Sequence, residues 1–420
     1  MRKLCILLLL TVCFHSSFGQ KTKQDVLKLW KNMDSAKVEI QKHLPEMGFG
    51  SVLIYDGKVI KKVFNGYANR KTKRKYSAKT IHLWGSVSKL FTAVAIMQLV
   101  EQKKLNLNDS ITKYIPELRG LPKASKYGLF SQITIQNLLN HNSGLGFVTV
   151  YKKMWEAIPA IKKRCPLKKE IIPFFKYATL NNKPGKKYQY SNSGFSLLGL
   201  VIKKITGLEY TDYVTQKIFK PLGMHTAHFG KTPKKRRKHI PTSYYTNKEG
   251  KVQDTYFNDI QGFQESNGGV KATIGDMVKF LNFIKFYDSS RKHQKVLKPK
   301  TIENYFLNFV EKNPNNHSIQ MKYKSFLMAY LSGFDYYQSL RKPTTYIGHS
   351  GSIEGFISYF NFRKDQPYGV ITMLNTTSVE GQKEAIAEFM VKVGHQITIS
   401  TYKNKRLKMN WKDVKKFLTE

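Results

Sequence analysis

Ser86 and Lys89 lie three residues apart at the start of a long apolar stretch, and together they could form a nucleophile and its base. A serine hydroxyl is a weak nucleophile until a neighbouring group takes its proton. Residues i and i+3 of a helix share a face, so a helix that begins at Ser86 would bring the lysine amine to the serine oxygen. Burial disfavours the charged form of a lysine, which would let Lys89 act as a base. The alternative is that Ser86 is only a polar N-cap of a buried helix.

Tyr190 and Asn192 lie between a Pro-Gly turn and a second apolar helical pattern, in the stretch KPGKKYQYSNSGFSLLGLVI. This arrangement places both side chains at the start of a helix, where they can face a cleft. Tyr190 could instead be an ordinary packed tyrosine. Asn192 could be a plain helix cap, a role that does not exclude contact with a substrate.

A third group of polar and small residues, His349, Ser350, Gly351 and Ser352, lies in YIGHSGSIEGF. The small residues would let a ligand approach the backbone closely, and we expect this stretch to be an edge strand that closes the site. GHSGS differs from the G-x-S-x-G nucleophile elbow at position 352, and ordered Asp and His partners for that triad are not found in the sequence. A purely structural histidine is the alternative for His349.

These short motifs are individually weak evidence in a lysine-rich chain. The Ser-x-x-Lys spacing recurs at Ser110, Ser289, Ser339 and Ser400, and Tyr-x-Asn recurs at Tyr67, Tyr245, Tyr359 and Tyr402. The surrounding sequence distinguishes these Ser-x-x-Lys matches, because only Ser86 lies at the start of a long apolar helical pattern.

The histidines do not suggest a metal site. His225 and His228 are close in sequence, but no cysteine, aspartate or further histidine completes a ligand set around them. His141, in LLNHNSGL, is typical of an interior turn. We therefore expect no metal ion and no cofactor.

Three helices are predicted from apolar spacing and capping signals. The spacing predicts helices over 22–44 and 86–102, and the second is apolar over so much of its surface that it should be buried. A further helix is predicted over 268–284, where Thr273 and Asp276 resemble a capping box. A last helix is expected over 380–395.

Strand patterns occur at both ends of the chain. Two β-rich runs within 48–70 flank Asp56-Gly57, a strong hairpin signal. Strand patterns return at 355–362 and 368–375, whereas residues 105–260 carry short helical patterns with little strand signal. Strands at both ends with helices between them predict one α/β layer built from both ends, with a helical domain inserted.

The chain of 420 residues is therefore divided into four parts. We expect a signal peptide, an α/β domain with an antiparallel sheet made from two segments, a mostly helical domain between them, and a basic C-terminal tail. The corresponding ranges are 1–19, then 20–80 with 261–400, then 81–260, and finally 401–420.

The three motifs SVSK, YSN and HSG occur in the order found in serine β-lactamases and penicillin-binding proteins, and the chain resembles that superfamily. The tyrosine form of the middle motif is similar to class C β-lactamases, DD-peptidases and related esterases. The histidine form of the last motif is similar to some DD-carboxypeptidases and D-aminopeptidases. The resemblance covers roughly residues 45–395 and implies an α/β (α+β) fold of the β-lactamase/transpeptidase type, an antiparallel sheet flanked by helices with an inserted mostly helical domain.

The resemblance also implies roles for the residues that match its motifs. Ser86 would be the acylated nucleophile, and Lys89 and Tyr190 would share the proton transfers, with the acylation base left open between them. Asn192 would hydrogen-bond the substrate amide.

The last motif would complete the site implied by the resemblance. His349 and Ser350 would hold a substrate carboxylate or steer the site electrostatically, and Gly351 would keep the backbone accessible. The backbone N–H groups of Ser86 and Ser352 would form the oxyanion hole. Histidine at 349, where class C enzymes usually carry lysine, argues against strong β-lactam hydrolysis.

The first residues of the chain are typical of an export signal. Arg2 and Lys3 precede an apolar run from Leu4 to Phe14 and small residues at 17 and 19, a pattern that predicts signal-peptide cleavage and a secreted or periplasmic protein. Acylation at Cys13 would make a lipoprotein, but bulky Val12 disfavours that reading. Only Cys165 would remain after cleavage, so no intramolecular disulfide is expected.

The formal net charge is +43, with lysine and arginine concentrated in runs at 69–75, 162–169 and 231–239. Such a field attracts anionic polymers, which predicts weak association with envelope polymers. No nucleic-acid-binding motif accompanies the charge, so we expect no specific nucleic acid as a partner. Nor do we expect a transmembrane segment.

Together these observations predict an exported serine hydrolase that forms an acyl-enzyme at Ser86. Its substrate would be a small molecule or peptide with an amide or ester bond: a D-amino-acid peptide, a β-lactam or a small ester. The alternative from another class is a non-hydrolytic sensor or scaffold protein of the same fold.

Overall fold

A computed structural model describes most of the region in which the three motifs lie. The described residues are 22–28, 30–31, 48–121, 126–146, 171–246, 252–254, 262–308, 318–322, 326–339, 345–353 and 355–378. The expected signal peptide, Cys13, Cys165, the helix predicted over 380–395 and the tail 401–420 lie outside these residues.

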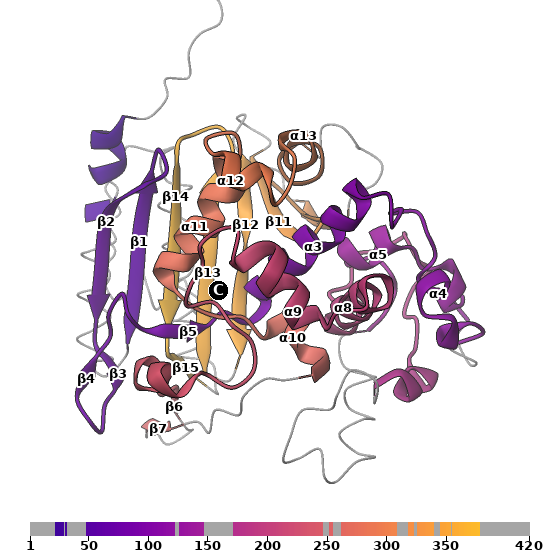
Figure 1. Ribbon diagram of the computed structural model, residues 1–420, viewed down its shortest axis with the longest axis horizontal. Helices are drawn as coiled ribbons and strands as arrows, with labels where there is room; N and C mark the ends of the chain where they lie inside the picture. Colours follow the sequence, from indigo (N-terminus) through magenta and orange to yellow (C-terminus); the bar gives the residue numbers. More distant parts are fainter. Residues whose placement is uncertain are drawn as a thin grey trace, which may run out of the picture.

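The centre of the molecule is an eight-stranded antiparallel sheet whose strands come from both ends of the chain (Figure 1). Strand β1 pairs with β14, and this pairing joins the two ends, as the sequence predicts. The order across the sheet is β2-β1-β14-β13-β12-β11-β10-β9. The strands are β1 (Phe49–Tyr55), β2 (Lys58–Asn65), β9 (Ser318–Lys322), β10 (Phe326–Leu331), β11 (Phe334–Ser339), β12 (Thr345–Ile353), β13 (Phe356–Arg363) and β14 (Tyr368–Leu374).

The hairpin expected at Asp56-Gly57 joins β1 to β2. Both turn residues have positive φ, 48° at Asp56 and 69° at Gly57. Two-residue hairpin turns that match the strand twist need this left-handed backbone, which Asp and Gly tolerate. The prediction is confirmed.

Helices cover the sheet and gather beside it. In Figure 1, α11 (Ile274–Lys285) and α12 (Arg291–Gln294) lie over the sheet, while α3 (Lys89–Glu101), α5 (Ile135–Leu139) and α8 (Asn192–Thr206) gather beside it. Further helices in the described part of the chain are α4 (Ile111–Tyr114), α9 (Tyr210–Val214), α10 (Glu265–Gly268) and α13 (Pro299–Ile302), and residues 23–28 and 30–31 are also helical. The 3-10 segments are η1 (Gly85–Ser88), η2 (Pro116–Leu118), η3 (Phe130–Gln132), η5 (Ile172–Tyr177), η7 (Lys234–His239) and η8 (Gly262–Gln264), and the π-helical segments are η6 (Thr215–Phe219) and η9 (Glu303–Leu307).

Helix α3 is buried from Lys89 to Leu99, as its nearly uniform apolar sequence predicts. A helix that is apolar on every side is stable only inside a core. It packs against α8 and against α10, the short helix before β8 (Lys271–Thr273). The segment that carries Ser86 and Lys89 is therefore fixed from several sides.

Several strands were not expected. Strands β9, β10 and β11 were not predicted, and the prediction that β12 is an edge strand is wrong, because β12 is an interior strand paired with β11 and β13. Two short strands, β6 (Tyr244–Thr246) and β7 (Val252–Asp254), lie within the stretch read as helical and join β15 (Thr376–Ser378) in a separate sheet. Further two-stranded sheets are formed by β3 (Tyr67–Asn69) with β4 (Arg74–Lys75), and by β5 (Ile81–Leu83) with β8.

The capping box expected at the start of α11 is wrong. Thr273 is the N-cap residue, but its side chain makes no capping hydrogen bond. The Asp276 carboxylate instead accepts hydrogen bonds from the backbone N–H groups of Thr226, at 2.6 Å, and Ala227, at 3.1 Å. The Asp276 carboxylate therefore binds a loop that is distant in the sequence and does not cap its own helix.

No helix in the described part of the chain is both long and apolar enough to cross a membrane. Within the same residues, His, Cys, Asp and Glu side chains form no group of three that could hold a metal ion.

Candidate active site

The Ser86 hydroxyl receives two hydrogen bonds from other side chains. Lys89 Nζ donates to Ser86 Oγ at 3.1 Å, and the Tyr190 hydroxyl donates to the same oxygen at 2.7 Å. Neither η1 nor α3 has a side-chain capping bond at its start. The alternative that Ser86 is only an N-cap is therefore wrong, and the oxygen lies between two groups that can exchange protons with it.

Lys89 is fully buried, with 0% of its side chain exposed. Its amine donates to the Asn267 carbonyl oxygen at 2.8 Å as well as to Ser86. Burial lowers the pKa of Lys89 well below its usual value, and the opposing influence of the Asp335 carboxylate is smaller. A neutral amine beside a serine hydroxyl has the lone pair that a general base needs.

Tyr190 is held by aromatic neighbours at the start of α8. Its ring lies 4.2 Å from the His141 ring, centroid to centroid, and the Lys89 amine lies 4.8 Å from the Tyr190 ring centroid. His141 Nδ1 accepts a hydrogen bond from the Ser191 backbone N–H at 3.1 Å. This histidine therefore fixes both the ring of Tyr190 and the backbone directly after it.

Asn192 is the first residue of α8, but the helix is capped by its neighbour. The Ser191 hydroxyl accepts from the Gly194 N–H at 3.1 Å, so the plain-cap alternative for Asn192 is wrong. Among the described residues, Asn192 Oδ1 is buried without a hydrogen-bond partner. A buried acceptor of this kind is satisfied when a ligand brings an N–H group to it.

Strand β12 lies directly against the Ser86 segment at Gly351. A Cβ at Gly351 would lie 2.2 Å from the Trp84 carbonyl oxygen and 3.1 Å from the Ser86 nitrogen. A Cβ at Gly85, which has φ of +53°, would lie 3.2 Å from the Ser352 nitrogen. The close approach that only glycine permits brings the Ser86 and Ser352 amides to one place, as an oxyanion hole requires.

Trp84 holds the segment before Ser86 in place against β12. Its indole N–H donates to the Ala272 carbonyl oxygen at 3.0 Å, and its own carbonyl accepts from the Ser358 hydroxyl at 2.8 Å. The side chain is completely buried. Trp84 therefore ties the turn before Ser86 to both β8 and β13.

Among the described residues, the half of β12 that faces the site pairs with a strand on one side only. Strand β11 pairs with β12 only from Thr345 to Gly348, whereas β13 pairs along β12 as far as Ile353. The side chains of Ser350 and Ser352 are exposed. A peptide-like substrate can add to such a strand through backbone hydrogen bonds.

His349 is buried and neutral. Its Nδ1 lies 2.5 Å from the Ser350 carbonyl oxygen, to which an Nδ1–H donates, and its Nε2 lies 3.0 Å from the Tyr330 hydroxyl. Burial lowers the pKa of His349 to about 3, and a positive charge on Lys89 would lower it further. The geometry favours the structural alternative over electrostatic steering, because a neutral imidazole brings no positive charge to a carboxylate.

The structure thus brings all eight predicted site residues to one region, and it adds four that the sequence analysis did not select: Trp84, His141, Asn267 and Tyr330. Asn267 contributes a backbone carbonyl, a group that every residue carries. Tyr330 precedes the Ser332-Gly333 turn, a usable hairpin signal that was not followed.

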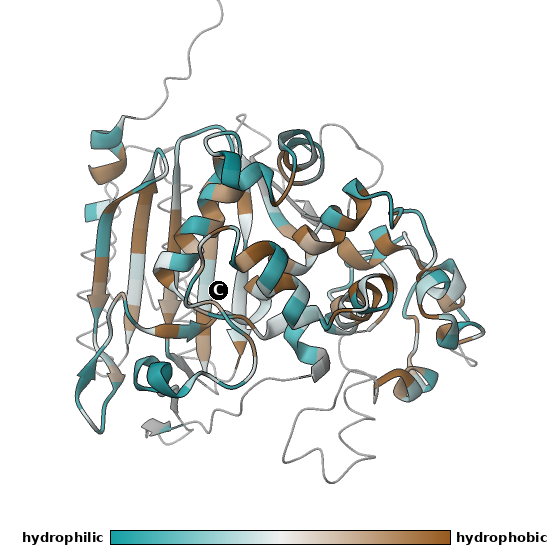
Figure 2. Cartoon of the chain, viewed as in Figure 1, coloured by the Kyte–Doolittle hydropathy of each residue, from teal (hydrophilic) through white to brown (hydrophobic). Residues whose placement is uncertain are grey.

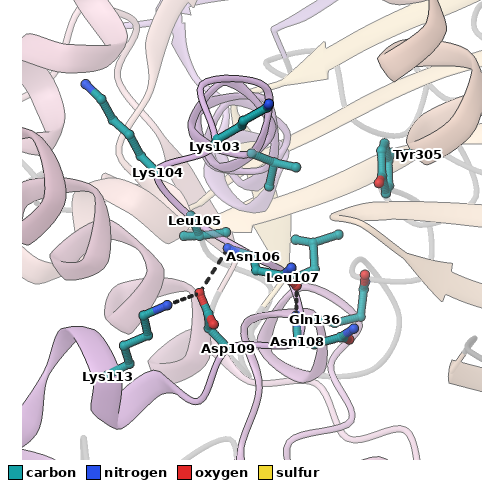
Figure 3. Close-up of a pocket in the computed structure, with 11 residues that line it drawn as sticks. Lys103, Lys104, Leu105, Asn106, Leu107, Asn108, Asp109, Lys113, Gln136 and Tyr305 are labelled. Atoms are coloured by element: carbon teal, nitrogen blue, oxygen red, sulfur yellow. Dashed lines mark hydrogen bonds and ion pairs between the residues drawn. The ribbon is translucent and has the colours of Figure 1, made fainter.

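A cavity of about 540 Å³ lies away from these residues (Figure 3). Its walls include Lys103, Asn106 and Tyr305. The Asp109 carboxylate in its wall is already occupied by Lys113, at 3.0 Å, and by the Asn106 N–H, also at 3.0 Å. Ser86 does not line this cavity.

The fold is β-lactamase/transpeptidase-like, as comparison with solved structures shows. An octameric penicillin-binding protein homologue from Pyrococcus abyssi matches with a TM-score of 0.70 at 25% identity, covering 89% of this chain and 78% of that one. A class C β-lactamase matches with a TM-score of 0.67 at 18% identity, covering 92% of this chain and 100% of that one. The second likeness is evidence of the fold alone.

The chain belongs to the Beta-lactamase family, whose model matches residues 40–394, and hence to a superfamily of serine hydrolases. Protein flp of Staphylococcus aureus (strain N315) is 26% identical over 341 residues, which are 81% of this chain and 61% of that protein. The putative penicillin-binding protein PbpX of Bacillus subtilis (strain 168) is 28% identical over 277 residues, 64% of each chain. This chain therefore spans less than two thirds of these relatives' lengths. The predicted family resemblance is confirmed.

Proposed function

We propose that the protein is an exported serine hydrolase that acts through an acyl-enzyme at Ser86. The observation that carries this proposal is the double hydrogen bond to Ser86 Oγ, from the buried amine of Lys89 and the hydroxyl of Tyr190. A structural serine has no need of two proton-exchanging partners, one of which is costly to bury.

The acylation step uses the groups around Ser86. As Ser86 Oγ attacks the carbonyl carbon of an amide or ester, its proton passes to neutral Lys89, or to a Tyr190 phenolate whose own proton Lys89 has taken. The carbonyl oxygen gains negative charge between the amides of Ser86 and Ser352, and such preorganised donors stabilise it. The proton then passes to the leaving amine or alcohol as the tetrahedral intermediate collapses to the acyl-enzyme.

Water completes the proposed reaction by attacking the acyl-enzyme. Neutral Lys89, or a Tyr190 phenolate whose own proton Lys89 holds, takes a proton from the water, and Ser86 leaves with a proton returned to its oxygen. The oxygens and protons balance as hydrolysis, with a carboxylic acid as the second product. The Asn267 carbonyl, 2.8 Å from Lys89 Nζ, keeps the amine oriented through both halves.

The proposed substrates are small esters and peptide amides of D-amino-acid type, with β-lactams as weaker substrates. The unpartnered Asn192 Oδ1 and the open side of β12 suit an acyl group with backbone-like N–H and C=O groups. Neutral His349 gives a terminal carboxylate no charged partner at that position. This disfavours substrates, including penicillins, that depend on such a charge.

The test is the intact mass of the protein over time after mixing with benzylpenicillin and, separately, with an activated ester. A mass increase that Ser86→Ala abolishes would support the acyl-enzyme. A long-lived penicillin adduct would favour a peptidase. Rapid loss of the adduct, with penicillin consumed, would favour a β-lactamase. Absence of any Ser86-dependent adduct or turnover with either reagent would favour the binding-protein alternative instead.

A further inference from the structure

Two of the basic runs in the sequence, far apart along the chain, lie on one face of the protein. The first run spans the end of β3, the turn after it and β4, and the second leads into η7 and includes it. Arg74 Nη2 donates to the Ile240 carbonyl oxygen at 2.5 Å, which joins the first run to the residue directly after the second. In Figure 1, β3 and β4 lie at the same end of the large sheet as β6 and β15, and in Figure 2 the turn between β3 and β4 is among the most hydrophilic parts. We call residues 66–80 and 230–243 together the basic face.

The basic face is a fixed surface rather than two independent loops. Asn69 Nδ2 donates to the Thr242 hydroxyl at 2.8 Å, and the Thr242 N–H donates to the Ala68 carbonyl at 2.7 Å. The Asn375 side chain, at the end of β14, donates to the carbonyls of Thr242, at 2.8 Å, and Tyr67, at 3.0 Å. Both segments are therefore anchored to the end of the central sheet.

The charge on this face is strongly one-sided. Each segment carries six lysines and arginines, and neither contains an aspartate or glutamate. Within the described residues, Asp254 forms an ion pair with Lys71 at 2.7 Å. Burial, with repulsion from Lys238, Arg74 and Lys79, lowers the pKa of His239. Many like charges held at fixed positions destabilise the folded chain unless anions neutralise them.

We propose that the basic face binds a linear anionic glycan of the cell surface. A polyanion that runs across both segments releases condensed counterions at each contact and relieves the repulsion among the lysines. Single-stranded nucleic acid fits less well, because it needs exposed aromatic rings for its bases. Here the Tyr67 ring is covered by the Lys75 ammonium at 4.1 Å, and Tyr76 and Tyr244 are buried.

A membrane surface also fits less well than a glycan. Stable membrane binding needs apolar side chains that insert beside the charges. The large hydrophobic residues exposed in the described part of the chain are Val59, Leu129 and Tyr177, and all three lie outside the basic face. The face therefore offers charge without an apolar anchor.

The test compares charge removal on the basic face with the same removal elsewhere. Lys234→Gln/Lys235→Gln/Lys238→Gln removes three exposed ammonium groups from η7. The matched control, Lys58→Gln/Lys61→Gln/Lys62→Gln, removes three exposed ammonium groups from β2 and gives the same net charge. Polygalacturonate is the probe, with single-stranded DNA and anionic phospholipid vesicles as competitors.

We expect the wild-type protein to bind polygalacturonate with a steep salt dependence. The η7 variant should bind about tenfold more weakly at low salt and show a shallower salt slope, whereas the β2 variant should bind like wild type. Both variants should retain Ser86-dependent hydrolysis. Equal weakening by both variants, no binding of the glycan by wild type, or tighter binding of DNA or vesicles would each overturn the proposal.

Discussion

The amine of Lys89 lies 3.1 Å from the hydroxyl oxygen of Ser86 because a 3-10 turn, η1, separates the two residues. In a 3-10 turn, side chains at i and i+3 are nearly eclipsed, so they point the same way along the helix axis. The α-helix α3 begins only at Lys89 itself. The geometry that pairs a base with a nucleophile is therefore set by the backbone of the turn, before any substrate binds.

Replacement of Lys89 by methionine should remove the base and stabilise the fold. The chain length and burial are kept, but no lone pair remains, so acylation should fall by about 10²- to 10⁴-fold. Because burial lowers the Lys89 pKa, burying this amine costs folding free energy that a buried methionine does not. Stopped-flow acylation with an activated ester and thermal unfolding measure the two effects. Wild-type acylation rates in Lys89→Met would rule out this role.

The acylation rate of the wild-type protein should depend on the protonation of Lys89. The rate should be lost as the pH falls through the lowered pKa of this amine and be constant above it. An ordinary exposed lysine would instead need a pH above about 10 to be neutral. A rate that still rises up to pH 10 would show that Lys89 is charged at neutral pH and is not the base.

Tyr190→Phe should separate proton transfer from packing. The phenyl ring keeps the contact with the His141 ring at 4.2 Å, while the hydrogen bond to Ser86 at 2.7 Å is lost. We expect kcat to fall by about 10²-fold or more with an unchanged melting temperature. His141→Asn is the companion variant, because asparagine tolerates the φ of 53° at this position. If Tyr190→Phe keeps full kcat, Tyr190 is an ordinary packed tyrosine.

Gly351→Ala should open the oxyanion hole. The new methyl group would lie 2.2 Å from the Trp84 carbonyl and 2.5 Å from the Ser358 hydroxyl, so β12 must move away from Ser86. Loss of one oxyanion donor lowers kcat by about 10²- to 10³-fold, and we expect KM to change little. The control is Gly275→Ala in α11, where the new Cβ would lie 3.9 Å from the Thr273 hydroxyl oxygen, an ordinary van der Waals contact. Similar kcat values for the two variants would contradict the assignment.

Buried neutral histidines should make the protein acid-sensitive. His82 and His349 are buried, and burial lowers the pKa of each to about 3. The unfolded chain takes up these protons near pH 6.5 and the folded chain does not, so each histidine contributes stability that is lost as the pH falls from 6.5 towards 3. The loss should be about 1.4 kcal/mol per pH unit for each histidine. Urea unfolding at pH 7, 6 and 5 measures it.

A histidine variant provides the control for this pH dependence. His82 is held by the Tyr76 hydroxyl at 3.0 Å and the Ile357 carbonyl at 3.1 Å, and His82→Gln keeps hydrogen-bonding capacity without a titratable ring. The variant should be less stable at pH 7 but lose stability less steeply in acid. An unchanged slope would mean that His82 is not buried in its neutral form.

The local chemistry of the site could be predicted from sequence because it depends on short spacings. Ser86 and Lys89 are one turn apart, and a type I′ turn at Asp56-Gly57 needs only its own two residues. The family order of the motifs then linked Ser86 to Tyr190 and to β12. Spacing and motif order are features of the sequence itself, so these parts of the site could be predicted without a structure.

The partners that hold the site are set by tertiary packing and could not be predicted in the same way. Asn267 contributes only its backbone carbonyl to Lys89, and nothing in its side chain marks that role. His349 is the opposite case, because its motif indicated a charged ligand contact whereas its burial beside Tyr330 makes it neutral. Whether one residue is buried depends on how the whole core packs, so the sequence around that residue predicts its burial only weakly.

The most direct test of the account is to treat the protein with a fluorophosphonate probe and map the modified residue by mass spectrometry. Such probes react covalently with an activated serine whatever its natural substrate. We expect one modified residue, Ser86, with modification strongly slowed in Lys89→Met. Modification of another serine that persists in Ser86→Ala, or a Ser86 that stays unmodified in folded wild-type protein, would contradict it.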